Sequence, residues 1–444
     1  EEAISFANYR LLLHRFQNSP GISYVNILME DLMLGKGYDT QNASTDFIKG
    51  GPAEFGNWVA EQIIAYGLQD GSNEANNYAN QYYQEVNPPI QMEQDGNSNV
   101  VDPNRWQAIE LSIAFDQAGN PITGPQAHLS PEWGNVNTFA MHDSLSTIQT
   151  DTSGNNYKVY NDPGPPALID VLDTACLSSL YKWNFLMVSI WQSHNTPNDT
   201  TVWDISPGNI GNVPTNYPTN IQGHQQFYNY MDGGHANEPG HAVNPITGQP
   251  YAPNLVKRGD YTRVVAEYWA DGLNSETPPG HWFRIMHDVT DSPSFVKKWM
   301  GQGPVLDDLT YDVLAHFVLG GLMHDAAISA WSIKGWYDYT RPAAALRWMG
   351  DQGQCSDPND LNYNPNGLPI ISGYSELVYV GDTLAGPNNE NVGKMKLFTW
   401  KGHEYINDPE VDVADVGWIL SEDFWTYQLP TFVTPPFAGY ISGH

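Results

Sequence analysis

Two long stretches of this chain, residues 86–165 and 193–255, are rich in proline, glycine and asparagine and lack a regular apolar repeat. Glycine and proline interrupt helices and strands, so both stretches are predicted to be loops. Loops of this length are uncommon in compact domains and tend to carry function. Both contain tryptophan and tyrosine, and we expect them to be ordered by packing on helices formed by the rest of the chain.

Apolar residues recur at helical spacing through most of the remaining sequence. This spacing covers residues 1–80, where Phe55–Leu68 is amphipathic and ends at Gly71, and it returns over Ala167–Gln192. After Arg258 the predicted helical segments are Tyr261–Trp269, His281–Val289, Ser292–Trp299 and Asp307–Trp331. Strand signals are weak, a loop is expected over 350–375, and Val413–Glu422 leads into a proline-rich stretch. The sequence therefore predicts a mainly α-helical protein with long ordered loops and little strand.

The chain is strongly acidic, with 50 aspartates and glutamates, 19 lysines and arginines, and a net charge of −31. Such a surface repels nucleic acid and anionic membranes, so we expect no nucleic-acid partner. The simplest explanation of the charge is a surface that favours solubility. An anionic ligand can then bind only where basic side chains outweigh the acidic field, which makes a basic motif informative.

Cysteine spacing and hydropathy argue against two further classes of protein. The two cysteines, Cys176 and Cys355, form no C-x-x-C pair, so a thiolate zinc site is not expected, and the sequence leaves open whether they pair. No apolar stretch reaches about 18 residues, although Val313–Met323 comes nearest, so no membrane span is expected. The chain starts at Glu1 inside a helical pattern, and we expect it to be a processed or partial piece.

Lys334 and Arg341 form the first candidate motif, within the segment His324–Arg347. Seven helical residues rotate through roughly 700°, which returns Arg341 to the face of Lys334. Pro342 disfavours helix at Arg341, so Arg341 is expected in the last helical turn. Two cations beside Trp331 suit a tetrahedral oxyanion, because arginine offers fork-like donors and lysine a movable charge. The alternative is a helix end at which basic residues complement the dipole.

The second candidate motif is the last part of the chain, Phe437–His444. Ser442 offers a hydroxyl donor, and Gly443 offers an amide N–H that a ligand can approach closely because no Cβ intervenes. His444 titrates near neutral pH and can move protons. Taken alone, these are three common residues, and a terminal histidine can be a tag remnant.

Taken together, Lys334-x6-Arg341-Pro342 and Ser442-Gly443-His444 resemble the signature of vanadium-dependent haloperoxidases and their relatives in the acid-phosphatase-like superfamily. Trp331 and Phe437 stand where fungal-type chloroperoxidases have the aromatics that line the vanadate pocket. Further stretches are similar to bacterial members of the family and extend the resemblance over residues 50–444: Leu129–Gly134, Tyr268–Gly272 and Ser275–Trp282.

The resemblance implies a helical bundle of the haloperoxidase and acid-phosphatase type that binds vanadate, with phosphate able to take its place. Lys334, Arg341, Ser442 and the Gly443 amide would bind the oxygens of the anion. His444 would deprotonate hydrogen peroxide, and Lys334 would polarise the bound peroxide for attack by halide, which releases hypohalous acid. The resemblance further implies a secreted, periplasmic or cell-surface protein of a bacterium from a saline environment.

Asp271 is a candidate for orienting Arg341 through a carboxylate–guanidinium pair, by analogy with the family. The alternative is a turn residue before Gly272. The family also needs a second arginine and a histidine bound to vanadium, which follow the S-G-H motif in known members. Both would lie beyond residue 444, so no axial histidine is assigned. We expect a C-terminal continuation or a cleaved partner fragment to complete the site; a chain acting alone would hold vanadate poorly.

We expect residues 1–444 to form a single large domain that is incomplete at its C-terminal end. Its N-terminal helices and loops would cover 1–255, and the helical half with the active site would cover 256–444. The sequence leaves homo-oligomer formation open. Two other functions also stay open, which are a phosphatase on the same scaffold and a catalytically silent structural or surface protein. The oxygen-rich loop Asp70–Glu74 can hold Ca²⁺ but lacks the full twelve-residue pattern.

Overall fold

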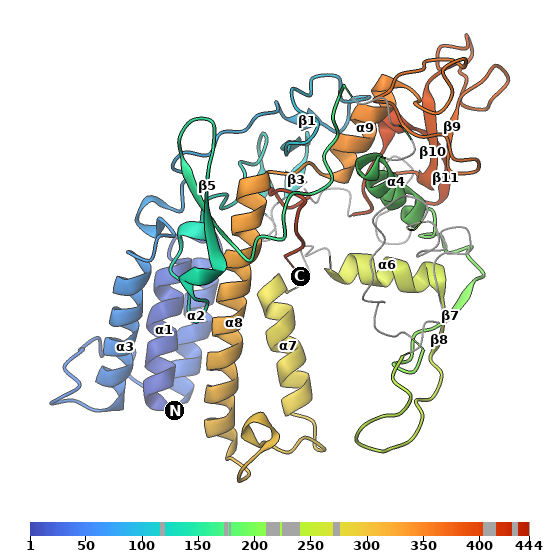
Figure 1. The fold of residues 1–444 in the computed structure, drawn as a ribbon. Helices are drawn as coiled ribbons and strands as arrows, with labels where there is room; N and C mark the ends of the chain where they lie inside the picture. The colour runs from blue at the N-terminus through green and yellow to red at the C-terminus, as the bar shows by residue number, and fades with distance from the viewer. Residues whose placement is uncertain are drawn as a thin grey trace. The chain divides into compact units, whose positions relative to one another are not determined.

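The computed structural model describes residues 1–115, 120–172, 176, 179–209, 223, 240–269, 276–402, 414–428 and 434–443. The chain is mostly helical, with 36% of residues in helices and 12% in strands, which confirms the predicted fold class (Figure 1). Its contacts divide it into two compact units. The first unit contains Glu1–Tyr83, Ser130–Tyr160 and His324–Ser332, and the second contains Gln84–Leu129, Asn161–Met323 and Ile333–His444. The division at residue 255 stays a prediction.

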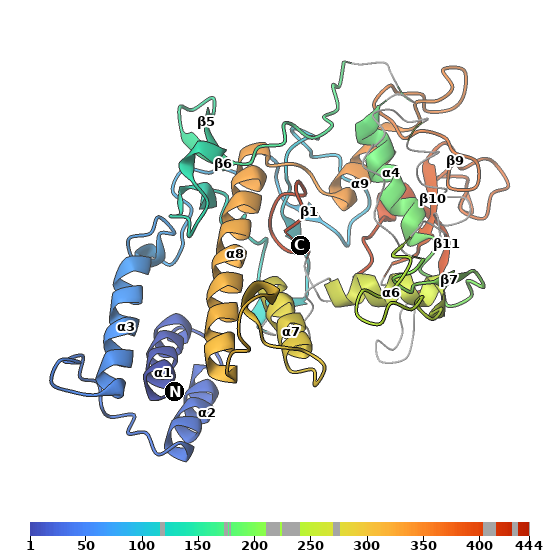
Figure 2. The same ribbon diagram turned by 60° about the horizontal axis from the view of Figure 1, so that its bottom comes forward.

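The first unit is built on three helices that lie side by side in both ribbon views (Figures 1 and 2), namely α1 (Glu2–Phe16), α2 (Ile22–Gly35) and α3 (Pro52–Gly67). They confirm the helical spacing predicted within residues 1–80. Gly56 of α3 lets α1 approach closely, because a Cβ at this position would lie 2.2 Å from the carbonyl oxygen of Ala3. The unit also contains a hairpin of β5 (Ser146–Thr150) and β6 (Asn156–Tyr160).

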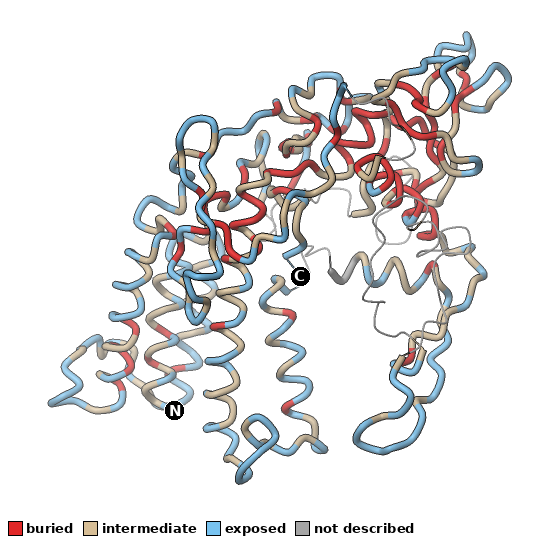
Figure 3. Tube along the Cα trace, in the orientation of Figure 1, coloured by how far each residue is buried: buried red, intermediate tan, exposed pale blue. Residues whose placement is uncertain are grey.

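The second unit has its core where two helices pack with a three-stranded antiparallel sheet, and the buried residues gather there (Figure 3). The helices are α4 (Leu180–Gln192) and α9 (Pro342–Gln352). The sheet has the order β11 (Val416–Leu420), β10 (Met395–Trp400), β9 (Ser375–Leu377). The large side chains of Trp183, Leu346 and Leu397 are buried in this core, which supports the start of α9.

The second unit also contains α6 (Arg258–Trp269) and α7 (Pro278–Thr290), while α8 (Asp308–Tyr337) contributes residues to both units. Within the second unit α7 lies beside the first turns of α8, and the Nε2 atoms of His287 and His316 are 2.9 Å apart. The remaining described strands are short pairs: β1 (Ile90–Gln91) with β2 (Ile109–Glu110), β3 (Ala114–Phe115) with β4 (Pro121–Ile122), and β7 (Val202–Asp204) with β8 (Leu255–Lys257).

Two predicted helical segments differ from the structure. Residues Ser292–Trp299 are not helical, because Pro293 has no N–H with which to continue α7, and a turn follows in which Phe295 N–H bonds to the Ser292 oxygen. The helix expected over Ala167–Gln192 begins only at Leu180, where the Ser179 hydroxyl accepts the amide of Lys182 at 3.5 Å. The first of these predictions was therefore wrong, and the second placed the start of its helix too early.

By length and composition alone, α8 is the one described helix that is apolar enough to cross a membrane. A single such helix is weak evidence, because the core helix of a soluble protein passes the same test. The absence of a membrane span stays a prediction.

Cys176 and Cys355 form a disulfide in the second unit, which answers a question that the sequence left open. Replacing both cysteines with serine should lower the free energy of unfolding by about 2–5 kcal/mol, because the bond joins residues 179 apart and restricts the unfolded chain. Urea denaturation with and without reductant measures the effect, and the double variant should not respond to reductant. An unchanged wild-type midpoint after reduction would contradict the prediction.

Candidate oxyanion site

The junction between α8 and α9 separates Lys334, in the last turn of α8, from Arg341, which is the residue before α9. Asp338 ends α8 in a left-handed conformation, with φ 44° and ψ 44°, and its N–H bonds to the Lys334 oxygen at 2.8 Å. Arg341 is extended, with φ −112° and ψ 160°, and Pro342 opens α9. The prediction that Arg341 occupies the last turn of the helix of Lys334 is therefore wrong. Pro342 excludes helical backbone at Arg341 and starts a new helix instead.

The two cations nevertheless converge on the segment that leads into Ser442 and Gly443. The Lys334 ammonium donates to the Ala438 oxygen at 2.8 Å, and Arg341 Nε donates to the Phe437 oxygen at 2.6 Å. The Phe437 ring lies beside both, with its centroid 4.7 Å from Lys334 Nζ and 4.8 Å from Arg341 Cζ. The structure therefore brings together Lys334, Arg341 and Phe437, which the two sequence motifs contribute separately.

The C-terminal segment passes very close to the start of α9. Gly439 N–H donates to the Tyr339 oxygen at 2.8 Å, and a Cβ at Gly439 would lie 2.6 Å from the Thr340 oxygen. A side chain at position 439 would thus push the segment away from Arg341. Glycine at this position allows the close approach on which the pair of hydrogen bonds depends.

Burial lowers the pKa of both cations. Lys334 is 2% exposed, and its burial, with a further contribution from the charge of Arg341, lowers its pKa to about 7. Arg341 is half-buried, and burial lowers its pKa to about 10. Both shifts mean that the charged forms have lost hydration. An anion bound beside them would restore favourable interactions for the charged forms.

The other residues predicted for the site are placed only in part. Ser442 and Gly443 lie at the exposed end of the same segment. Trp331 is a half-buried residue of α8, in the part of the helix that belongs to the first unit. His444 and Asp271 lie outside the described residues. The roles of these five residues stay predictions.

Two residues that the motifs did not single out take part in the arrangement. His128 has a fully buried side chain, and its Nε2 lies 3.1 Å from the amide nitrogen of Ala438. Asp338, also fully buried, pairs with Arg105 at 3.2 Å. Asp338 stands between Lys334 and Arg341 in the sequence, so its position was a usable signal. His128 is 310 residues from Ala438, and no local pattern indicates that contact.

The affinity of the site for a tetrahedral dianion should fall as the pH rises above about 7. The free protein holds Lys334 with a pKa of about 7, and a bound anion raises this pKa because it favours the ammonium. Above pH 7 binding must therefore take up a proton, so affinity falls by up to about tenfold per pH unit until the pKa of the complex is reached. Calorimetric titration with molybdate, whose charge is constant around neutral pH, measures the profile.

The matched control for this pH profile is Lys334→Arg, because a guanidinium stays protonated across the range. Its affinity should be nearly independent of pH near neutrality. A wild-type profile as flat as that of the control would contradict the assignment of the titrating group.

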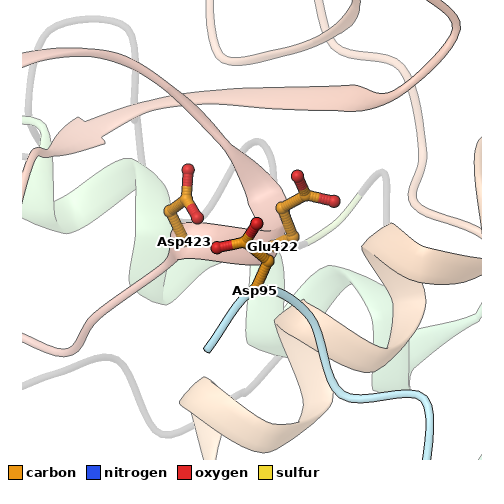
Figure 4. A group of neighbouring side chains, drawn as sticks. All are labelled: Asp95, Glu422 and Asp423. Carbon is orange, nitrogen blue, oxygen red and sulfur yellow. The ribbon is translucent and has the colours of Figure 1, made fainter. Parts of the chain in front are cut away.

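A group of carboxylates lies elsewhere in the second unit (Figure 4). Oxygen atoms of Asp95, Glu422 and Asp423 all lie within 4.8 Å of one another, but Glu422 also pairs with Lys394 at 2.6 Å. No second observation marks this group as a cation site. In the loop proposed for Ca²⁺, both carboxylates have protein partners. Asp70 accepts the Ser72 amide at 2.8 Å, and Glu74 pairs with His14 at 2.8 Å.

No family model matches the chain, and no curated protein matches it. Two solved structures of bacterial vanadium-dependent chloroperoxidase are similar to it at 13% sequence identity. The apo-type structure gives a TM-score of 0.49 and covers 99% of this chain and 63% of that chain. The holo-type structure gives 0.47, with 99% and 62%. The chain thus spans less than two thirds of the chloroperoxidase chain. It is similar to bacterial vanadium-dependent chloroperoxidase in structure along nearly its whole length, at low sequence identity.

Proposed function

We propose that this chain carries the oxyanion-binding part of a vanadate-dependent haloperoxidase, which oxidises halide with hydrogen peroxide to hypohalous acid. The observation that carries the proposal is the convergence of Lys334 and Arg341 on Phe437 and Ala438. Phe437 and Ala438 stand shortly before the Ser442–Gly443–His444 motif in the sequence, which supports the assignment of the cations and the motif to one site.

The donors present fit a tetrahedral oxyanion such as vanadate. The bond from Arg341 Nε to Phe437 does not use the N–H donors on the two terminal nitrogens of the guanidinium. The Lys334 ammonium adds a positive charge and donates to the Ala438 oxygen. The Ser442 hydroxyl and the Gly443 amide would add neutral donors. Vanadate, when bound, supplies an electrophilic centre that activates hydrogen peroxide toward halide.

Each residue of the chain then has a separate task. Arg341 holds the anion with a charge that is constant at physiological pH. Lys334, with a pKa of about 7, can donate a hydrogen bond or a proton to the reacting oxygen. The Phe437 ring lies beside both cations and would keep water from their shared side. His444 would accept the proton of hydrogen peroxide, and Asp271 would orient Arg341.

We place this activity in the whole protein, because this chain spans less than two thirds of the chloroperoxidase chains to which it is similar. The described disulfide supports a secreted, periplasmic or cell-surface location, because such bonds persist in oxidising compartments. The net charge of −31 supports the absence of a nucleic-acid partner.

The test is bromide- or chloride-dependent halogenation of monochlorodimedone by the whole protein with vanadate and hydrogen peroxide. Activity that requires vanadate supports the proposal. Hydrolysis of p-nitrophenyl phosphate without vanadate, and no halogenation, would instead establish a phosphatase. A protein that binds neither vanadate nor phosphate would refute the oxyanion site and favour a structural role.

A further inference from the structure

His128 lies against the C-terminal segment with its ring fully buried and packed edge-on against Trp106, 4.8 Å between ring centroids. Its Nε2 is 3.1 Å from the Ala438 nitrogen, and its Nδ1 is 3.1 Å from the Leu129 oxygen. A peptide N–H can only donate, so Nε2 must accept and carries no proton. Nδ1 therefore carries the proton and donates to the Leu129 carbonyl. Its partners thus fix both the ring orientation and the tautomer of His128.

The peptide group that bonds to His128 also accepts Arg341, and the peptide group that follows it accepts Lys334. Ala438 donates its N–H to His128 and accepts Lys334 through its oxygen, while the preceding carbonyl, of Phe437, accepts Arg341. Leu129 adds a second bond on the same side, from its N–H to the Pro436 oxygen at 2.7 Å. Residues 128 and 129 therefore hold the segment from one side while α8 and α9 hold it from the other.

The surroundings keep His128 in its neutral form, in which Nε2 accepts a hydrogen bond. Burial is the main reason that its pKa is lowered to about 3, and the charges of Arg341 and Lys334 lower it further. Asp338 Oδ1 lies 3.9 Å from Nε2 and is the carboxylate that would favour protonation. That carboxylate also pairs with Arg105, which divides its charge between two partners. At neutral pH the imidazole is thus an acceptor, and the cations help to maintain that form.

We propose that His128 is a positioning residue of the oxyanion site, which fixes the Phe437–Ala438 peptide so that Lys334 and Arg341 meet at one anion. The role rests on the proposed function, since it concerns the same anion. In this role His128 acts indirectly, through the Phe437–Ala438 peptide that accepts Arg341 and through the adjoining Ala438 carbonyl that accepts Lys334.

The test compares His128→Leu, which removes the acceptor at similar volume, with His128→Gln, whose Oε1 can reach the position of Nε2. Thr399→Val is the matched control. It removes a buried hydroxyl in the same unit that donates to the Ser189 oxygen at 3.0 Å and makes no described bond to residues 434–443. Two quantities are measured on the full chain: hydrogen exchange of the peptide 434–443 by mass spectrometry, and the affinity for molybdate as a function of pH.

His128→Leu should speed exchange in peptide 434–443 and lower molybdate affinity by about tenfold or more. It should also shift the pH at which affinity begins to fall, because Lys334 loses its fixed position. His128→Gln should restore most of both quantities, and Thr399→Val should change neither. Loss of affinity without rescue by His128→Gln would contradict positioning through an accepted hydrogen bond.

Two outcomes separate this proposal from the proposed function. Wild-type molybdate binding that depends on Lys334 but is unchanged in His128→Leu would overturn the role of His128 and leave the oxyanion site intact. A wild-type chain that binds neither molybdate nor vanadate would refute the oxyanion site, and the role of His128 in anion binding with it.

Discussion

Replacing Lys334 with methionine should lower the affinity for vanadate by about 100-fold and abolish vanadate-dependent halogenation. A hydrogen bond to a charged group contributes about 1.5–3 kcal/mol, and about 1.4 kcal/mol corresponds to a factor of ten in affinity. Methionine fills the space of the lysine stem, so the buried surroundings on α8 are retained. Arg341→Met should have an effect of similar size, because it removes a charge beside the same ring. Equilibrium dialysis with vanadate measures both variants.

Lys396→Met is the matched control for the lysine variant. Lys396 is also buried, at 8% exposure, and belongs to the same unit, but it pairs with Glu376 and Asp382 rather than with residues 434–443. The change in net charge is identical, so a general electrostatic effect would appear in both variants. Equal losses in the two lysine variants, or full halogenation by Lys334→Met, would show that the site is assigned to the wrong residues.

Replacing Arg347 with methionine should lower the free energy of unfolding by about 3–5 kcal/mol. Arg347 lies on α9 at 1% exposure and donates to the carbonyl oxygens of Met92, Gln94 and Phe424, at 3.0, 2.7 and 2.9 Å. Each buried carbonyl left without a donor costs about 1–3 kcal/mol. Part of that loss is offset, because burial of the guanidinium is itself unfavourable and lowers its pKa to about 10.

Urea denaturation at neutral pH measures this loss of stability. The free energy of unfolding of Arg347→Lys should lie between those of the wild type and the methionine variant. The lysine ammonium lacks the planar fork of the guanidinium and cannot reach all three carbonyls. A loss below about 1 kcal/mol for the methionine variant would show that water replaces the three bonds.

The helices that could be predicted from the sequence are those that bury one face and expose the other. α3 and α8 were predicted because their apolar residues recur at a local period. α9 was not predicted, since its residues Ala343–Met349 are all buried and therefore show no polar face. β10 carries Lys396 and Thr399 among apolar residues, and its place beside β11 and β9 depends on residues distant in the sequence.

Lys334 and Arg341 were singled out by their residue types and spacing, and Phe437 by the resemblance to the haloperoxidase family. The structure brings the three residues together, and their role at an anion stays a prediction. The assumption that one helix carries both cations was wrong, since Pro342 starts a second helix. His128 could not be predicted at all, because its relation to Ala438 exists only after residues 310 apart in sequence have met.

The break between α8 and α9 means that the gap between the two charges is not set by the rise of one helix. The distance between the two charges depends on how α9 packs in the hydrophobic core, through apolar residues such as Leu346. A methyl group added or removed in that core would therefore change the affinity for the anion slightly. In this protein, the packing of apolar side chains sets the distance between the two positive charges.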